Sequence, residues 1–290
     1  MREALVIDCD PGADDALALL MAAAAGFDLR LLTTVAGNAP VSVCTANARR
    51  VLDLVGRGDV PVHQGAAGPI GGGAVPDAVV HGPDGLAGLS LPPPSRGPDG
   101  MDGVSALAAA MPMAVAAIGP LTNIALLAAR GITPPRLVVL GGAIGPGNMP
   151  SGAEFNLAVD PLAAQAVLAR PCTLVPLDIA RAALATPARI AAIAAAGPVG
   201  ARIAPMLTAY AEADRRKTGA AGGMLPDAHA IAALVDPGLY TWRQAAIAVD
   251  GMGRTRFDWA TEKTGEGAAV AVGVDEEGFF ALVSRLLGML

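Results

Sequence analysis

ALVIDCDPGADDA, residues 4–16, is the stretch of sequence that decides the fold. Ala4–Ile7 is an apolar run rich in strand formers, and good helix formers follow the Pro-Gly turn from Asp14 to Ala25. A second unit of the same kind comes directly afterwards, with a strand predicted at Leu29–Ala36 and a helix at Val41–Val55. This alternation of strands and helices predicts an α/β fold built on a parallel sheet.

The rest of the chain continues the pattern. Further strands are predicted at Met113–Ile118, Leu137–Leu140, Thr173–Pro176, Ala245–Val249, Thr255–Trp259 and Ala268–Val274, and helices at Leu121–Ala129, Pro161–Ala169 and Glu276–Leu287. The segment Pro187–Val235 is mainly helical in pattern, whereas Gly65–Gly100 is rich in Gly and Pro and predicts a long surface loop. Neither a repeat nor a linker divides the chain, so residues 1–290 are expected to form a single domain.

Charge and composition limit the kinds of partner. The formal net charge is −6 and the longest basic cluster is Arg215-Arg216-Lys217, which argues against a nucleic-acid ligand and favours a small molecule. The three cysteines are far apart and lack metal-ligand spacing, so neither a disulfide framework nor a zinc site is predicted. No basic leader precedes a long apolar run at the N-terminus, and a cytoplasmic protein is expected.

One uncharged stretch, Gly103–Ala129, is long enough to span a bilayer. Pro112, Gly119 and Pro120 interrupt it, and such residues break a continuous helix. The stretch is therefore predicted to form a helix, a buried strand, a turn and a second helix, and no membrane insertion is expected.

Four carboxylates, Asp8, Asp10, Asp14 and Asp15, crowd the point where the first strand ends and the first helix begins. Helix capping and the helix dipole account for one or two of them. Asp10 lies beyond the carboxyl end of the strand, where open α/β sheets bind ligands. Gly12 permits the positive φ of a tight reversal that would bring Asp15 back toward Asp10.

Carboxylates that converge in this way repel one another unless a cation neutralises them. Oxygen ligands without a nearby Cys or His indicate a hard ion, either Ca²⁺ or Mg²⁺. The alternative is a helix whose acids only cap its first turn.

Residues 8–16, DCDPGADDA, resemble the DxDPGxDDA signature of the inosine-uridine-preferring nucleoside hydrolase family. Four further segments follow in the order of that family: TTVAGN at 33–38, HGPDGL at 81–86, GPLTN at 119–123, and EFN at 154–156 before Asp160-Pro161. The resemblance implies an open, mostly parallel α/β sheet flanked by helices, with a Rossmann-like core. It further implies Ca²⁺, a homodimer or homotetramer, and hydrolysis of the N-glycosidic bond of ribonucleosides to ribose and free base.

The resemblance also implies roles for individual residues. Calcium would be held by Asp10, Asp15, the main-chain oxygen of Thr122, and Asp227. The sugar would be surrounded by Asp14, Asn38, Asn148, Glu154 and Asn156. Asp10 would accept the proton of the attacking water, and the ring of oxygen atoms would stabilise the oxocarbenium-like ribose, with inversion at the anomeric carbon.

Each of these assignments has a structural alternative. Asn38 and Asn148 follow glycines and could be turn residues, while Thr122 and Asp227 could cap helices, which for Thr122 is compatible with metal binding. Glu154 and Asn156 alternate around Phe155, which places both on one side if the segment is extended.

The sequence departs from the family pattern on the side of the leaving base. Many members carry a histidine just before the aspartate that corresponds to Asp227, but Pro226 stands here. His229 lies two residues farther along a helix, about 200° around its axis, and would face away. His81 is therefore the better candidate for contacting the base, with an ordinary loop histidine as the alternative. An Arg or Tyr of the segment Tyr210–Lys217 could instead supply the proton or stabilise the leaving anion, or solvent could protonate a purine at its own ring nitrogen.

Two other functions remain open. A phosphohydrolase could use the Asp8-Cys9-Asp10 pair with Mg²⁺, but this class needs a later lysine to balance phosphate charge, and the chain contains only Lys217 and Lys263. A nucleoside- or ribose-binding homologue with weak or no turnover is the non-catalytic alternative, because Pro226 cannot donate a proton.

Overall fold

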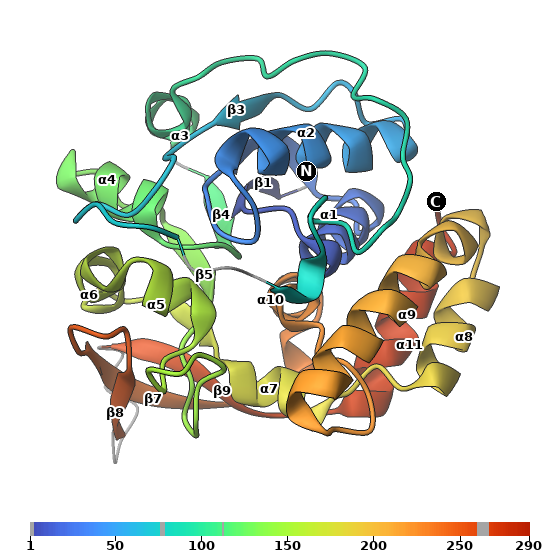
Figure 1. Ribbon diagram of the computed structural model, residues 1–290. Coiled ribbons are helices and arrows are strands. Elements are labelled where there is room, and N and C mark those ends of the chain that lie inside the picture. Colours follow the sequence, from blue (N-terminus) through green and yellow to red (C-terminus); the bar gives the residue numbers. More distant parts are fainter. Residues whose placement is uncertain (1–2, 76–78, 112, 260–266) are drawn as a thin grey trace.

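The computed structural model describes residues 3–75, 79–111, 113–259 and 267–290 (Figure 1). The strands are β1 (Ala4–Cys9), β2 (Asp28–Thr34), β3 (Val62–Gln64), β4 (Ala114–Ala117), β5 (Arg136–Leu140), β6 (Thr173–Val175), β7 (Tyr240–Val249), β8 (Thr255–Trp259) and β9 (Ala268–Val274). The α-helices are α1 (Ala13–Ala24), α2 (Val41–Leu54), α3 (Gly103–Ala110), α4 (Thr122–Ala129), α5 (Phe155–Val159), α6 (Pro161–Leu168), α7 (Leu177–Ala182), α8 (Pro187–Ala195), α9 (Pro198–Thr218), α10 (Pro226–Val235) and α11 (Glu276–Leu287). Short 3₁₀ helices occur at Val79–His81 and Pro237–Leu239.

The described strands form one open sheet in the order β3-β2-β1-β4-β5-β6-β9-β7-β8. Every pairing from β3 across to β9 is parallel, and β7 lies antiparallel to both β9 and β8. The expectation of an open, mostly parallel α/β sheet is confirmed. The chain runs from β1 outward to β2 and β3 and then returns to β4 on the other side of β1. The strand order thus reverses beside β1, and such a switch point is where open sheets bind ligands.

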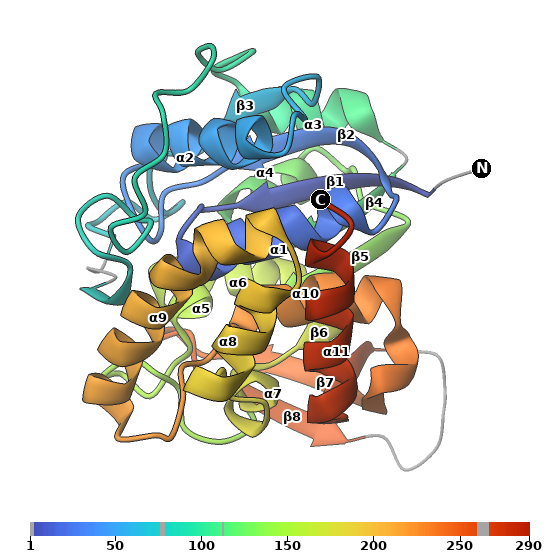
Figure 2. The ribbon, with the colours of Figure 1, turned by 90° about the vertical axis from the view of Figure 1, so that its right-hand side faces the viewer.

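Helices cover both faces of the sheet (Figure 1). The side chains of β1 alternate between the two faces: Leu5 and Ile7 pack in the core beneath α1 and α10, whereas Val6 packs in the core beneath α4 and α6. Figure 2 shows α8, α9 and α11 outside the first of these layers. The interior contains few aromatic residues, and small side chains such as Ala18 and Ala230 allow α1 and α10 to pack closely.

Most predicted elements agree with this architecture, and β8, β9 and α11 have the predicted bounds, whereas β7 begins at Tyr240 instead of Ala245. The first strand is longer than expected and continues through Asp8, a charged residue that is fully buried. Its carboxylate accepts hydrogen bonds from the Thr33 hydroxyl and the Asn123 amide, which makes burial of this polar side chain possible. Two short helices, α5 and α7, escaped prediction because each is too short for a clear periodicity.

The uncharged stretch Gly103–Ala129 forms α3, β4 and α4, as its punctuation predicts, with Pro112 outside the described residues. Among the described residues, no helix combines the length and the apolar character needed to cross a bilayer. The described part of the predicted loop Gly65–Gly100 contains the three-residue 3₁₀ helix Val79–His81 and, at Gly100, an isolated β-bridge to His63. Residues 76–78 lie outside that part.

Candidate active site

A cavity of about 260 Å³ opens at the carboxyl ends of the parallel strands, beside the switch point. Its size is close to the lower end of the roughly 300–1,000 Å³ range of small-ligand pockets. Its lining comes from most of the chain: Asn38, Val80, His81, Ile118, Leu140, Gly147, Asn148, Glu154, Phe155, Asn156, Leu177, Arg181, Tyr210, Asp214, Lys217, Thr218, Met224, Pro226 and Asp227. The pocket therefore brings together residues that the sequence places in separate motifs.

The loop between β1 and α1 turns back on itself, as predicted. The Asp15 carboxylate accepts hydrogen bonds from the backbone N–H groups of Asp10 (3.2 Å) and Gly12 (2.9 Å) and from the Asn38 side-chain amide (2.9 Å). The predicted positive φ at Gly12 is wrong, because this residue has φ −97°. Glycine is required for space instead, since a Cβ atom there would lie 2.4 Å from His81 Nδ1.

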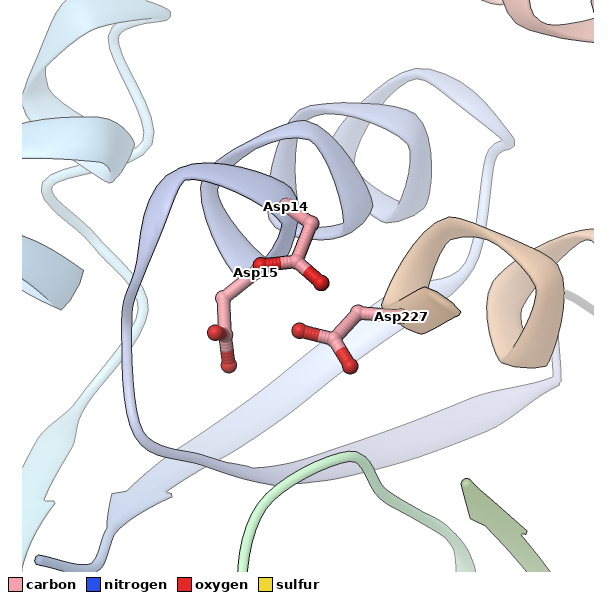
Figure 3. A group of neighbouring side chains, drawn as sticks. All are labelled: Asp14, Asp15 and Asp227. Carbon is pink, nitrogen blue, oxygen red and sulfur yellow. The ribbon is translucent and has the colours of Figure 1, made fainter. Parts of the chain in front are cut away.

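Three buried carboxylates form an acidic cluster next to the cavity (Figure 3). Asp14 and Asp15 come from the first turn of α1 and Asp227 from the first turn of α10, and one oxygen of each lies within 4.8 Å of the others. Burial raises the pKa of Asp14 and Asp227, and repulsion by neighbouring carboxylates raises both further. Burial also raises the pKa of Asp15, and a hydrogen bond with Asp227 partly offsets this rise.

Asp10 lies beside this cluster, and Asn38 donates hydrogen bonds to both Asp10 and Asp15. Its Oδ2 atom accepts the Asn38 backbone N–H at 2.7 Å, and its Oδ1 atom is buried without a hydrogen-bond partner among the described residues. Burial raises its pKa, and repulsion by Asp15 adds to the effect. Glycine at position 119 keeps the space around Asp10 open, because a Cβ atom there would lie 2.6 Å from Oδ1.

The resemblance implies a calcium set of Asp10, Asp15, Thr122 and Asp227, with Asp14 on the sugar. The structure groups Asp14 with Asp15 and Asp227, and Asp14 Oδ1 is also buried without a partner in the described part of the chain. Thr122 does not cap α4, whose N-cap is Leu121. Its hydroxyl donates to Asp160 instead (2.7 Å), which holds the first turn of α4 in place.

The fit of this cluster to a hard divalent cation can be judged from its donor atoms. All its donors are carboxylate oxygens, the ligand type that Ca²⁺ and Mg²⁺ prefer. Asp14 Oδ1, within the cluster, and Asp10 Oδ1, outside the group of three, are both without partners among the described residues and can accept further contacts. Buried carboxylates that raise one another's pKa are stabilised by a bound cation, so the residues fit such an ion.

Glu154 and Asn156 both line the cavity, but their segment is helical and the extended conformation considered from the sequence is wrong. Glu154 is the N-cap of α5, and its carboxylate accepts the backbone N–H groups of Asn156 (2.9 Å) and Leu157 (3.3 Å). These bonds satisfy the free N–H groups of a helix start, which favours the helix. Burial raises the Glu154 pKa to about 7, and Gly142 N–H, at 3.0 Å, opposes the rise.

Asn148 lies on a loop that α7 holds in place. The Arg181 guanidinium donates to the carbonyl oxygens of Pro146 and Gly147, the latter at 3.2 Å. Asp178, in the first turn of the same helix, accepts the backbone N–H of Gly145 at 2.9 Å. The Oδ1 atom of Asn148 is buried without a partner among the described residues, and is thus available to a ligand.

The cavity is also lined by His81, Tyr210, Lys217 and Pro226, and His81 Nδ1 lies 3.7 Å from Asp14 Oδ1 of the acidic cluster. His81 Nδ1 accepts the Ala13 backbone N–H at 3.1 Å, and its ring lies 5.1 Å from that of Tyr210. Burial lowers the His81 pKa to about 3, with a smaller effect of Lys217, so the ring is neutral and carries its proton on Nε2.

His229 does not line the cavity, as its position on the helix predicts. It is buried, its ring stacks on Phe279 at 3.7 Å, and Nδ1 lies 3.1 Å from the Tyr240 hydroxyl. Among the lining residues, the cations Arg181 and Lys217 were not singled out from the sequence. The chain's near absence of lysine and the helix-ending Gly219 are the signals that could have marked Lys217.

Comparison with known proteins shows the family to which the chain belongs. The family model for inosine-uridine preferring nucleoside hydrolases matches residues 5–281. A pyrimidine-specific ribonucleoside hydrolase of Shewanella woodyi is 36% identical over 99% of this chain and 98% of its own length. A non-specific ribonucleoside hydrolase of Escherichia coli O7:K1 is 34% identical over 100% and 99%. The solved structure of a purine-preferring ribonucleoside hydrolase from Gardnerella vaginalis superposes with a TM-score of 0.89 at 27% identity, covering 99% of both chains. The chain therefore belongs to the inosine-uridine preferring nucleoside hydrolase family.

Proposed function

We propose that this cavity hydrolyses the N-glycosidic bond of ribonucleosides, with Asp10 as the base that activates water and with Ca²⁺ as the cofactor. The reaction class follows from membership of the family. The single observation that carries the finer proposal is the group of buried oxygens at the switch point, where Asp10 Oδ1 and Asp14 Oδ1 lack partners among the described residues.

Calcium would be held by Asp10, Asp15, Asp227 and the main-chain oxygen of Thr122, and the position of Asp14 makes it a further candidate. When bound, the ion supplies a Lewis acid that lowers the pKa of water and orients the ribose hydroxyl groups. The hard oxygen donors favour Ca²⁺ or Mg²⁺ over softer metals, and the resemblance favours Ca²⁺.

The reaction requires a base for the attacking water. Asp10 is held in position by the Asn38 backbone N–H, which leaves Oδ1 as the atom that can accept the proton. The water oxygen bonds to the anomeric carbon while the C1′–N bond breaks. The electron pair of that bond goes to the leaving nucleobase. Direct displacement of this kind inverts the anomeric centre.

The ribose becomes positively charged as the bond breaks. Asn38, Asn148, Glu154 and Asn156 line the cavity with oxygen atoms that can stabilise this charge. The Asn156 side-chain amide donates to the Ile118 carbonyl at 3.0 Å. This bond fixes the Asn156 side chain and turns its Oδ1 atom away from Ile118. Because these groups are held before substrate arrives, they need little reorganisation during the reaction.

The direct test is release of ribose from inosine, uridine, adenosine and cytidine by the purified chain, with and without a chelator, and with Ca²⁺ or Mg²⁺ added back. We expect ribose from at least one nucleoside, loss of release with the chelator, and recovery with Ca²⁺. Release that is insensitive to the chelator would contradict the metal role. Binding of nucleosides without any release would favour the non-catalytic alternative.

A further inference from the structure

The base that leaves a nucleoside takes the electron pair of the C1′–N bond and needs a proton or a cation to stabilise it. Pro226 has no group that can supply either. His229 is packed between Phe279 and Tyr240, away from the cavity. If a protein group assists departure, it comes from other residues that line the pocket.

Three of the lining residues are weaker candidates. The Arg181 guanidinium is already bonded to the carbonyl oxygens of Pro146 and Gly147. Burial keeps His81 neutral by lowering its pKa to about 3. Burial, followed by nearby carboxylates, raises the pKa of Tyr210 well above its usual value. His81 and Tyr210 can donate neutral hydrogen bonds, but neither brings a positive charge.

Lys217 brings that charge. It lies in the last turn of α9 and lines the cavity together with its neighbour Thr218. Its positive charge contributes, after burial, to lowering the pKa of the His81 ring. Among the described residues it forms no ion pair, so its charge is available to a ligand.

The end of α9 is anchored, which fixes the position from which Lys217 extends. Asp214, one turn earlier and buried, accepts the Met224 backbone N–H at 2.9 Å. The helix ends at Gly219, with φ 73°, and the Gly219 backbone N–H bonds to the Arg215 carbonyl. A cation in the last turn is also favoured by the helix dipole.

We propose that Lys217 is a catalytic residue that protonates the departing base, in place of the histidine for which this chain has Pro226. The inference rests on the proposed nucleoside hydrolysis. A proton passes from Nζ to a ring nitrogen or carbonyl oxygen of the base as the C1′–N bond breaks. Lys217 lines the cavity and is exposed to solvent, so bulk water returns the proton to the amine.

The test compares two kinds of leaving group. Inosine and uridine need assistance, whereas the 4-nitrophenolate of 4-nitrophenyl β-D-ribofuranoside departs without a proton. For Lys217→Gln, we expect kcat/KM to fall about 100-fold or more on the nucleosides and less than about threefold on the nitrophenyl riboside. Lys217→Arg keeps the charge but cannot give up a proton, so its nucleoside activity should stay far below that of the wild type. Arg216→Gln, an exposed neighbour outside the cavity lining, should match the wild type on both substrates.

Two results would overturn the role of Lys217: full nucleoside activity in Lys217→Gln, or an equal loss on both substrates. The equal loss would indicate damage to the sugar and water side of the site. Absence of ribose release by the wild type from both substrates would instead contradict the proposed function itself. Because Lys217 is exposed, its replacement should leave the melting temperature unchanged, and a thermal melt of each variant checks this.

Discussion

His229 is a titratable residue in a position that excludes charge. Its ring is fully buried, stacks on Phe279, and leaves Nε2 without a partner among the described residues. Burial lowers its pKa from 6.5 to about 3. We therefore predict that His229 makes the protein sensitive to acid, and that His229→Asn removes this contribution.

The sign and size of the effect follow from linkage. Between pH 6.5 and pH 3 the unfolded chain binds a proton at His229 that the folded chain does not, so stability is lost as the pH falls. From pH 6.5 down to pH 4.5 the folded protein loses about 1.4 kcal/mol of stability per pH unit through His229. Over these two units the loss reaches about 3 kcal/mol. The other acids and His81 are the same in both proteins and cancel in the difference.

The assay is urea unfolding of the wild type and of His229→Asn at several pH values from 7.5 to 4.5. The free energy of unfolding of the wild type should fall relative to the variant by about 3 kcal/mol over this range. Tyr240→Phe disturbs the same hydrogen bond but keeps the histidine, so it should retain the acid sensitivity of the wild type. A difference between wild type and His229→Asn that stays constant with pH would refute the reasoning.

Two further predictions concern the site. A cation present at 100 times its Kd stabilises a protein by about 2.7 kcal/mol. The entropy of unfolding is roughly 2.1 cal/mol/K per residue, so for 290 residues this stabilisation raises the melting temperature by about 4 °C. Ca²⁺ added to chelator-treated protein should produce such a shift in a thermal melt. Asp227→Asn should weaken Ca²⁺ binding at least about tenfold, as measured by calorimetry. An unchanged affinity would mean that the ion binds elsewhere. Gly12→Ala should cost about 1–3 kcal/mol of stability and lower kcat, because the new methyl group collides with His81. Gly97→Ala, which meets no atom within 4 Å, is the matched control, and equal effects of the two substitutions would contradict the steric explanation.

Much of the fold could be predicted from sequence because its signals are local. The alternation of apolar strands and amphipathic helices fixes the succession of elements, and parallel strands that share an edge bring Asp10, Asn38 and Thr122 to one end of the sheet. Elements such as β9 and α11, with clear periodicity and a capping Asp275, were predicted with their observed bounds.

The rest depends on contacts between distant segments. Glu154 caps α5 because its carboxylate accepts hydrogen bonds from free backbone N–H groups. A three-residue sequence pattern cannot distinguish such a helix start from an extended strand. Gly12 is needed because His81, far along the chain, packs against it. Lys217 lies in an ordinary basic run in the sequence, and only the fold brings the last turn of α9 to the cavity.

Asp10 is the proposed base that takes the proton of the attacking water. Asp10→Asn keeps the size of the side chain and an oxygen that can still accept the Asn38 N–H, but it removes the proton acceptor. The rate of ribose release at saturating substrate and Ca²⁺ should fall by about 100-fold or more, while thermal stability and nucleoside binding persist. A variant that releases ribose at the wild-type rate would contradict the role of Asp10.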